Sequence, residues 1–239
     1  MCGRVVQARP LDELSELYAA EPDAAAVAAL RPRFNVAPTD PLAVVLVEDG
    51  HRRLSAHRWG LLPSSRPAAT RAAPLINARA ETILRNGLFR AAFERRRCLV
   101  PVDGFYEWQR LPDRRQPWFI HRGDGEPLAL AGIWAPWRDG PDGRLLGTCA
   151  IVTRAPAGIV ARLHDRMPAV LPAAAWAPWL DPAASTGALE DLLRTVAEPG
   201  LEAYPVGLWV NSVRNDGAHL VERVAEQAPL FPDQGEAAV

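Results

Sequence analysis

The sequence predicts an α+β domain in which mostly antiparallel strands curl into a barrel-like core with helices around it. Short apolar runs separated by turn residues crowd residues 98–153, whereas runs with helical spacing lie before and after that stretch. The chain has 239 residues, of which 49% are hydrophobic and 23% charged, the balance of a globular domain. Because no linker divides it, we expect a single domain over residues 1–226 and a loosely ordered tail over 227–239.

The N-terminal part of the chain alternates between helical and strand patterns. Two helical patterns come first, and Pro32 ends the second, which is rich in alanine. The turn signal Asp49-Gly50 then joins an apolar run to an alternating one, which predicts a hairpin. Two more helical patterns follow, separated by the stop signal Asn86-Gly87. In chain order we expect helices 11–20 and 24–30, strands 42–47 and 51–57, and helices 78–85 and 88–97.

From Cys98 onward the pattern changes to short strands rich in β-branched and aromatic residues. That many short strands with turn residues between them predict a largely antiparallel sheet. Helical patterns return only near the C-terminus. In chain order we expect strands 98–102, 105–110, 117–121, 128–134 and 146–153, helices 173–180 and 187–196, and a last strand near 202–210.

Composition excludes several classes of protein. No apolar run approaches the roughly 20 residues needed to span a bilayer, and the first ten residues lack the apolar core of a signal peptide. We therefore expect a cytoplasmic protein and no membrane partner. Three cysteines without a CxxC pair argue against a disulfide framework and against a structural zinc site.

Charge is unevenly spread along the sequence. Residues 51–122 hold fifteen basic and five acidic residues, net +10, whereas the rest of the chain has net −11. A basic middle is a candidate surface for a polyanion, unless charges that are separate in sequence interleave in space. All 27 basic residues are arginine, so the N-terminal amine is the single amine that could form an imine.

Cys2 directly follows the initiator methionine. A small second residue normally lets Met1 be removed, which would expose an α-amine beside a thiol. The reference pKa is about 7.7–8.0 for the amine and about 8.5 for the thiol, and a cation such as Arg4 lowers the latter. This 1,2-aminothiol attacks an aldehyde in two steps, because the amine forms an imine and the thiolate then closes a thiazolidine ring. The alternative is a frayed terminus with an incidental cysteine.

Three other positions carry residue types suited to chemistry. Asn77 could orient a sugar hydroxyl or simply cap a helix, and Arg79 could hold a phosphate. Glu107 lies between aromatic residues, where burial would raise its pKa toward general acid/base work unless an arginine pairs with it. His164 could hydrogen-bond a developing alkoxide, or it could be a structural histidine whose ring nitrogens are hydrogen-bonded within the fold. Asp165 could determine which ring nitrogen of His164 carries the proton.

Seven motifs, in this order, resemble those of the SRAP family, the SOS-response-associated peptidases, also described as abasic-site processing proteins. The resemblance runs from Cys2 to about Asp216. The motifs are CGR (2–4), RFNVAPT (33–39), RWGLLP (58–63), INARAET (76–82), RCLVPVDGFYEW (97–108), AGIW (131–134) and HDRMP (164–168).

The resemblance implies the SRAP fold and covalent capture of abasic sites in single-stranded DNA. Family members join the N-terminal cysteine to the aldehyde of the ring-opened deoxyribose as a thiazolidine crosslink. Carried over by motif, Cys2 is the nucleophile, Asn77 positions the sugar, Glu107 serves acid/base steps and reversal, and His164 assists ring opening. The resemblance also implies self-removal of Met1 and, in some settings, a β-lyase-type strand cleavage, and it implies no metal or other cofactor.

The DNA contacts implied by the resemblance fall into two groups. Phosphates would be held by arginines, and the DNA-facing cleft would be lined by residues of mixed type. The phosphate contacts are Arg4, Arg79 and Arg166, and the cleft residues are Asn35, Pro38 and Trp108. We expect the protein to act as a monomer.

Two departures from the family pattern fall on the surface expected to contact DNA and not on the residues expected to react with the abasic site. Ser64-Ser65 stand where many members have a tryptophan that could wedge or stack. Asp40 stands where a neutral amide is common, and it places a negative charge near the expected phosphates.

Two other functions remain open from the sequence. A thiol peptidase would use Cys2 and His164 as nucleophile and base, although no Cys–His–Asn motif of a known protease family is visible. A non-catalytic single-strand binder would use the basic middle and the aromatic residues, and would bind intact and abasic strands equally.

Overall fold

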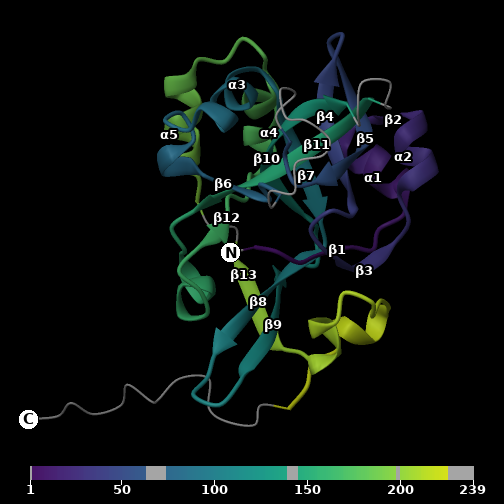
Figure 1. Cartoon of the computed structure of the whole chain (residues 1–239), viewed down its shortest axis with the longest axis vertical. Helices are drawn as coiled ribbons and strands as arrows, with labels where there is room; N and C mark the ends of the chain where they lie inside the picture. Colours follow the sequence, from purple (N-terminus) through teal and green to yellow (C-terminus); the bar gives the residue numbers. More distant parts are fainter. Residues whose placement is uncertain (1, 63–73, 139–144, 198–199, 226–239) are drawn as a thin grey trace, which may run out of the picture.

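The computed structural model describes residues 2–62, 74–138, 145–197 and 200–225, and it confirms the α+β class (Figure 1). The tail expected over 227–239 and the departure at Ser64-Ser65 lie outside the described residues. In chain order the helices and strands are β1 (Val5–Gln7), α1 (Leu11–Tyr18), β2 (Glu21–Pro22), α2 (Ala24–Ala29), β3 (Arg33–Val36), β4 (Pro41–Glu48), β5 (His51–Trp59), β6 (Asn77–Arg79), α3 (Gly87–Arg95), β7 (Arg97–Val102), β8 (Gly104–Arg110), β9 (Arg115–Arg122), β10 (Leu128–Arg138), β11 (Leu145–Arg154), β12 (Met167–Pro168), α4 (Ala173–Leu180), α5 (Thr186–Thr195) and β13 (Leu201–Pro205).

Strands β4, β5, β7, β10 and β11 close into the predicted barrel. β10 pairs antiparallel with β7 and β11, and β4 pairs antiparallel with β5 and β7. β5 and β11 close the ring by pairing in parallel, with Arg58 opposite Thr148 and Trp59 opposite Cys149. The barrel is therefore mixed, because the chain enters β11 in the same direction as β5.

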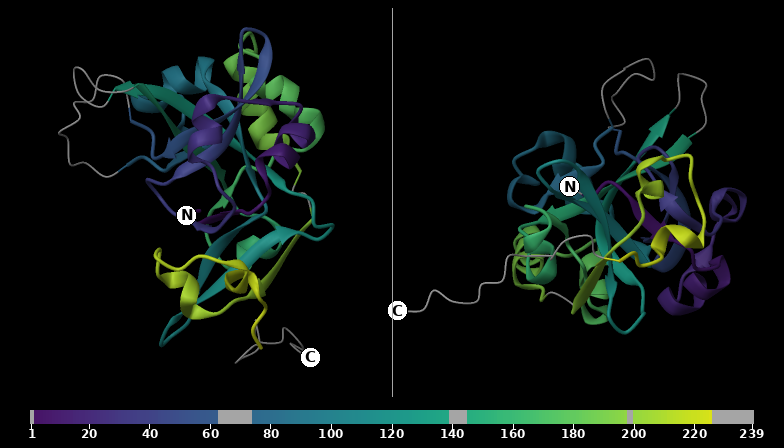
Figure 2. Two further views of the ribbon diagram at one scale, coloured as in Figure 1. Left: turned by 90° about the vertical axis from the view of Figure 1, so that its right-hand side faces the viewer. Right: turned by 90° about the horizontal axis from the view of Figure 1, so that it is seen from below.

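Both faces of the barrel strands are buried. In β4, Leu42 and Val44 belong to the hydrophobic cluster that fills the barrel and continues to Cys2. Ala43 and Val45, which alternate with them, belong to the cluster packed under α1, α3, α4 and α5. Helices cover the outer face of the barrel (Figures 1 and 2). This is why β4 reads as a continuous apolar run instead of an alternating one.

A second sheet, in the order β13-β9-β8-β1-β3, lies below the barrel in Figure 1. The N-terminal strand β1 pairs with β8 through Val5 opposite Phe105, so the start of the chain passes through the junction of the two sheets. A smaller hydrophobic cluster that includes Tyr106 and Val210 joins this sheet to the C-terminal segment. The junction is where the candidate catalytic residues meet.

The hairpin expected around Asp49-Gly50 is confirmed, with boundaries one or two residues longer. Asp49 has φ 49° and Gly50 has φ 79°, the left-handed pair that a two-residue hairpin turn requires. Helix 173–180 is also confirmed, with the boundaries that the sequence predicts.

The helix expected over 78–85 is wrong. Residues Asn77–Arg79 form β6, and only Ala80–Thr82 make a short 3-10 helix. β6 pairs in parallel with β11, with Asn77 opposite Ile151 and Arg79 opposite Thr153. A partner strand more than seventy residues away overrides the local helical pattern, because the pairing satisfies the backbone groups within a buried sheet.

The last strand is shorter than the expected 202–210. β13 ends at Pro205, and Leu208–Asn211 form a 3-10 helix. Val206 still donates to the Pro117 carbonyl of β9, and it also bridges to Arg223 in a later segment, where the amide of Val224 donates to the carbonyl of Pro205. This turn places the 3-10 helix beside the N-terminal segment.

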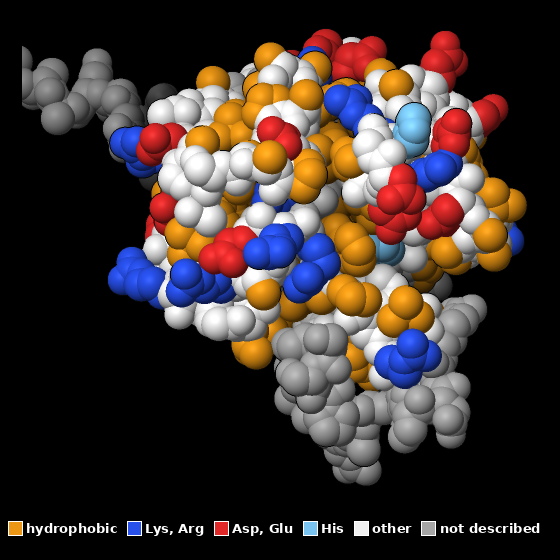
Figure 3. All heavy atoms as spheres, turned by 90° about the horizontal axis from the view of Figure 1, so that it is seen from above, with side chains coloured by type: hydrophobic (Ala, Val, Ile, Leu, Met, Phe, Trp, Pro, Cys, Tyr) orange, Lys and Arg blue, Asp and Glu red, His pale blue; other side chains and the backbone are white. Residues whose placement is uncertain are grey.

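Within the described part of the chain, no helix is long and apolar enough to cross a membrane. The face seen from above carries both arginine and acidic side chains (Figure 3). On that face the charges interleave, so the basic middle of the sequence does not form a uniformly positive surface there.

Candidate functional site

Cys2, Asn77, Glu107 and His164 meet where the start of the chain passes between the two sheets. β1 runs beside β8, which brings Cys2 near Glu107. Asn77 begins β6, and its place beside β11 turns it toward the same junction. His164 follows the 3-10 helix Gly158–Arg162, and its Nε2 lies 3.9 Å from Glu107 Oε2. Four segments far apart in sequence thus supply one site.

The side chain of Asn77 holds the backbone of Cys2. Its Nδ2 donates to the Cys2 carbonyl oxygen at 2.8 Å. Its Oδ1 is buried and accepts no hydrogen bond from any described residue. The capping alternative is wrong, because Asn77 starts a strand and bonds to Cys2 instead of to a helix amide. One acceptor in the site is left open to a ligand hydroxyl or amine.

Cys2 is fully buried, so it is not a frayed residue. Burial raises the pKa of its thiol well above the ordinary value, and the nearby Glu107 carboxylate adds to the effect. The thiol is therefore protonated at neutral pH, and a base has to take its proton before it reacts. Cys98 and Cys149, the other two free thiols, are buried inside the barrel cluster.

Glu107 is 2% exposed in the middle of β8. Burial raises its pKa from 4.5 to about 7. A carboxyl group with that pKa is present in both forms near neutral pH, which suits it to give and to take protons. This is the outcome that the sequence predicts for a glutamate among aromatic residues.

His164 makes two contacts through the same ring nitrogen. Nδ1 lies 3.0 Å from the backbone nitrogen of Arg166 and 2.8 Å from Asp165 Oδ1. The amide of Arg166 can donate only to an unprotonated Nδ1, whereas Asp165 can accept only from a protonated one. Burial lowers the pKa of His164, so the neutral ring prevails near pH 7. In the tautomer that accepts the Arg166 amide at Nδ1, the proton is on Nε2, which lies 3.9 Å from Glu107 Oε2.

Arg4 is held inside the protein. Its Nη1 donates to Asn35 Oδ1 at 2.6 Å and to the Val210 carbonyl at 2.7 Å. Asn35 is fully buried, and its Nδ2 donates to the carbonyls of Ser212 and Asn215 at 3.0 and 2.8 Å. Asn35 therefore fixes Arg4 and does not itself face solvent.

Trp108 borders the site next to Arg4. The Arg4 guanidinium lies 5.6 Å from the centre of the Trp108 ring, and Trp108 Nε1 donates to Asn211 Oδ1 at 2.7 Å. Trp108 is thus held in place at both its face and its edge. Pro38 is half-buried in the turn that follows β3.

Arg79 and Arg166 differ in availability. Arg166 makes a two-pronged ion pair with Glu81, both contacts at 2.8 Å, and also donates to the Thr153 carbonyl at 2.7 Å. Arg79 is exposed and makes no hydrogen bond or ion pair with any described residue. Of the two arginines expected to contact phosphate, Arg79 is therefore the one whose guanidinium is available to bind it.

The charge of Asp40 is offset locally. Its Oδ2 accepts from Arg33 Nη1 at 2.8 Å and from the backbone amide of Ala37 at 3.1 Å. Asp40 shapes the turn that carries Pro38, and it shares Arg33 with Asp216, whose Oδ2 accepts from Arg33 Nε at 3.0 Å.

A depression of about 600 Å³ opens at the site. Of the expected site residues, Glu107, Trp108 and His164 line it, whereas Cys2 and Asn77 do not. Arg110 and Arg115 line the same depression and are not among the residues expected from the sequence. The sequence predicts Arg110 at the end of one strand but starts the next strand at residue 117, so it does not pair Arg115 with Arg110. The lining residues are Glu107, Trp108, Arg110, Arg115, Leu163, His164 and Asp165.

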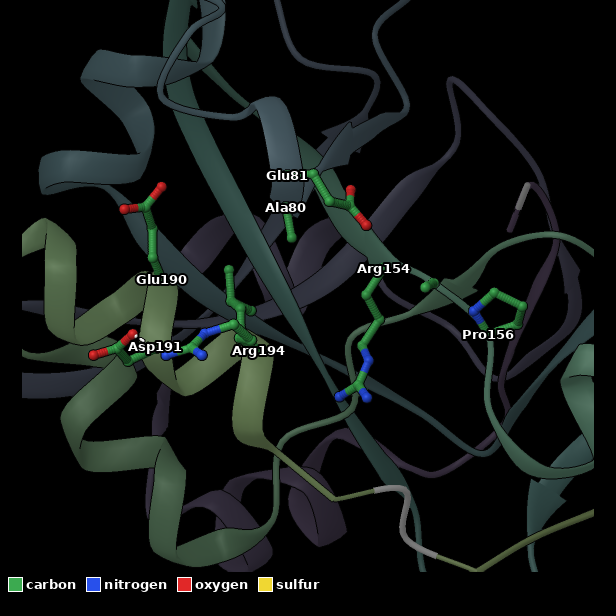
Figure 4. A pocket seen from close by; sticks show the side chains of 9 residues that line it. Ala80, Glu81, Arg154, Pro156, Glu190, Asp191 and Arg194 are labelled. Atoms are coloured by element: carbon green, nitrogen blue, oxygen red, sulfur yellow. Dashed lines mark hydrogen bonds and ion pairs between the residues drawn. The ribbon is translucent and has the colours of Figure 1, made fainter.

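A second depression, of about 510 Å³, lies between α5 and the segments around Glu81 and Arg154 (Figure 4). Acidic and basic side chains both line it, including Glu190 and Arg194. None of the expected site residues lines it, so it is separate from the junction site. In the described residues, no group of three or more His, Cys, Asp or Glu side chains could hold a metal ion.

The chain is similar to proteins of known family. The family model described as SOS response associated peptidase (SRAP) matches residues 1–213. The abasic site processing protein YoqW of Bacillus subtilis (strain 168) is 33% identical over 227 residues, which cover 93% of this chain and 99% of that protein. YedK of Escherichia coli (strain K12), with the same descriptive name, is 30% identical over 231 residues, covering 94% and 100%.

Relatives extend to vertebrates and to solved structures. The abasic site processing protein HMCES of Xenopus tropicalis is 29% identical over 217 residues, covering 78% of this chain and 64% of that protein. A crystal structure of a protein from Bacteroides thetaiotaomicron superposes with a TM-score of 0.81 at 22% identity, covering 94% of this chain and 100% of the other. A crystal structure from Bordetella bronchiseptica has a TM-score of 0.72 at 26% identity, covering 87% and 100%.

Proposed function

Because the chain belongs to the SOS response associated peptidase family, we propose that it processes abasic sites in DNA by covalent capture at Cys2. Relatives that span nearly all of this chain are named as abasic site processing proteins. The observation that carries the proposal is the placement of Cys2, whose backbone Asn77 fixes and whose thiol lies beside the Glu107 carboxyl.

The chemistry proceeds from the amine of Cys2 after removal of Met1. The amine adds to the C1′ aldehyde of the ring-opened deoxyribose, and the carbinolamine loses one water to give an imine. The thiol then adds across the C=N bond: sulfur bonds to C1′, and its proton goes to nitrogen. The product is a five-membered thiazolidine, and its mass is that of protein plus DNA less one water.

Glu107 serves both proton transfers. Its protonated form gives a proton to the departing hydroxyl of the carbinolamine, and its ionised form takes the thiol proton. A pKa of about 7 makes both forms available. His164 Nε2–H, which faces Glu107, donates to the sugar oxygen as the ring opens.

Asn77 and the arginines position the DNA. The open Oδ1 of Asn77 accepts a hydrogen bond from a hydroxyl of the abasic sugar. Arg79 and, after release from Glu81, Arg166 hold phosphates, and Trp108 and Pro38 border the strand. Arg4, whose Nη1 is bonded to Asn35 and Val210, adds its positive charge beside Trp108. A buried glutamate reaches a sugar that stands free of a base stack, and this favours single-stranded DNA as the substrate.

A thiol peptidase acting on other proteins would need His164 to take the Cys2 proton. His164 Nε2 faces the Glu107 carboxyl, and Glu107 is the group that acts on the Cys2 thiol electrostatically. This arrangement favours the DNA reaction. Cleavage is then confined to the bond after Met1, which the protein removes from itself.

Intact mass spectrometry tests the proposal. The untagged protein is measured alone and after incubation with a single-stranded oligonucleotide that carries one abasic site. Loss of Met1 and an adduct of protein plus DNA less one water, absent with the intact oligonucleotide, are expected. Retained Met1 with no adduct would refute covalent capture. Because the chain has no lysine, borohydride can trap an imine only at the N-terminus, which identifies the nucleophile.

A further inference from the structure

Two arginines face each other at the end of the hairpin formed by β8 and β9. Arg110 is the last residue of β8, Arg115 is the first of β9, and the two are direct cross-strand partners. Directly opposed residues of antiparallel strands lie about 5 Å apart on the same face of the sheet. Like charges in that position repel each other and destabilise the hairpin.

No direct side-chain contact with a described residue offsets this repulsion. The side chains of Arg110 and Arg115 make no hydrogen bond or ion pair with a described residue, and both residues are exposed. Other arginines near the site are engaged, because Arg4 bonds to Asn35 and Arg166 pairs with Glu81. The hairpin pair is thus an uncompensated double positive charge.

The pair also borders the reaction site. Arg110 and Arg115 line the same depression of about 600 Å³ as Glu107 and His164. The acidic groups there come from Glu107 and from Asp165, which lies against His164. An anion is therefore attracted to the hairpin wall and repelled from the wall that carries the carboxyl groups.

We propose that Arg110 and Arg115 form a clamp for one backbone phosphate of the DNA strand adjacent to the abasic residue. This inference rests on the proposed function, and it adds the place where the strand beside the abasic residue is held. A guanidinium pair matches the oxygens of a phosphodiester, and a bound phosphate removes the repulsion between the two cations. Arg110 shares its face of β8 with Trp108, so a phosphate on the hairpin brings the strand along Trp108 into the depression that Glu107 and His164 also line.

Binding at different salt concentrations tests the clamp. The double variant R110Q/R115Q is compared with R90Q/R95Q, which removes two arginines from α3, at the opposite end of the molecule from the hairpin (Figure 1). Fluorescence anisotropy measures non-covalent binding of a labelled single strand. We expect R110Q/R115Q to bind about tenfold more weakly, the loss of one charge-assisted contact. The slope of log K against log salt should fall by about 0.7 per lost phosphate contact.

A strand with one uncharged phosphate identifies the contact. Methylphosphonate is placed, one position at a time, at the phosphates on either side of the abasic residue. One position should weaken binding to the wild type and to R90Q/R95Q, yet have no effect on R110Q/R115Q. The melting temperature of R110Q/R115Q should equal or exceed that of the wild type, since the repulsion is gone, whereas a structural role would lower it.

The outcomes separate this inference from the proposed function. Equal affinity and equal salt slope for R110Q/R115Q and R90Q/R95Q would overturn the clamp, whether or not the wild type forms an adduct. A wild type that binds the strand but forms no adduct would overturn covalent capture, while the anisotropy comparison would still decide the clamp.

Discussion

The amide of Asn77 donates to the carbonyl oxygen of Cys2 at 2.8 Å, across 75 positions in the sequence. Through this bond β6 fixes the N-terminal residue against the barrel, and Asn77 Oδ1 stays open beside it. In the proposed capture of an aldehyde, a terminus held this way would present its amine and thiol in one orientation, which would lower the entropic cost of the reaction.

Replacing Cys2 by alanine should abolish the stable adduct with abasic DNA and leave folding intact. The α-amine remains, so an imine still forms, but no sulfur closes the ring. Intact mass without reductant should show no adduct, and borohydride should restore one. An unaltered yield of stable adduct would contradict the role of the thiol.

Replacing Asn77 by alanine should slow adduct formation by about tenfold or more, because one contact to the sugar and the anchor of Cys2 are both lost. The free energy of unfolding should fall by about 1 kcal/mol. Asn86→Ala is the matched control, since Asn86 caps α3 through the amide of Leu88 at 3.0 Å. The control should lose similar stability and keep the wild-type rate.

Replacing Glu107 by glutamine should slow the adduct reaction by about 100-fold or more, the size of a general acid/base contribution. The wild-type rate should depend on pH around the Glu107 pKa of about 7, and E107Q should lose that dependence. Glu48→Gln, on an exposed residue, should keep it. An unchanged pH profile in E107Q would show that another group moves the proton.

The same substitution should change the pH dependence of stability. The pKa of Glu107 is raised on folding, so the folded state holds its proton between the ordinary value of 4.5 and about 7. The stabilisation is present below pH 4.5 and is lost as the pH rises through 7. In urea unfolding at a series of pH values, the free energy of unfolding of E107Q should not show this decrease as the pH rises from 4.5 through 7.

His57 should make the protein sensitive to acid. His57 lies in β5, and its ring is buried against Trp134 of β10. Burial lowers the pKa of His57 from 6.5 to about 4. The folded state therefore binds fewer protons than the unfolded chain, and stability present above pH 6.5 falls by about 3 kcal/mol as the pH drops toward 4. His57→Leu should remove that part of the loss in urea unfolding, whereas His51→Leu, exposed in the same strand, should not.

Gly147→Ala should destabilise the barrel. A Cβ there would lie 2.2 Å from Cδ2 of the buried His57 ring, and such overpacking costs about 1–3 kcal/mol. Gly187→Ala in α5, where a Cβ meets no atom within 4 Å, should instead stabilise by up to about 1 kcal/mol. Thermal unfolding of the two variants measures both effects.

Local signals in the sequence determined much of the fold. The pair Asp49-Gly50 specifies its hairpin turn because few residues adopt two successive positive φ angles. The boundaries of α4 and the presence of the strands after Cys98 follow from apolar patterns within the segments themselves. Segment 78–85 shows the limit of local patterns, since its partner β11 lies outside any local window.

For the site, the sequence determined the residue types and their order, and hence the family and the chemistry they suit. The tertiary structure decided which of them lie together: Asn77 reaches Cys2, His164 faces Glu107, and Arg166 is bound by Glu81, 85 positions away. It also decided that Arg110 and Arg115 face one another. These contacts depend on strand pairing and barrel closure, which set distances between segments that no local pattern encodes, and burial at the junction then sets the pKa values.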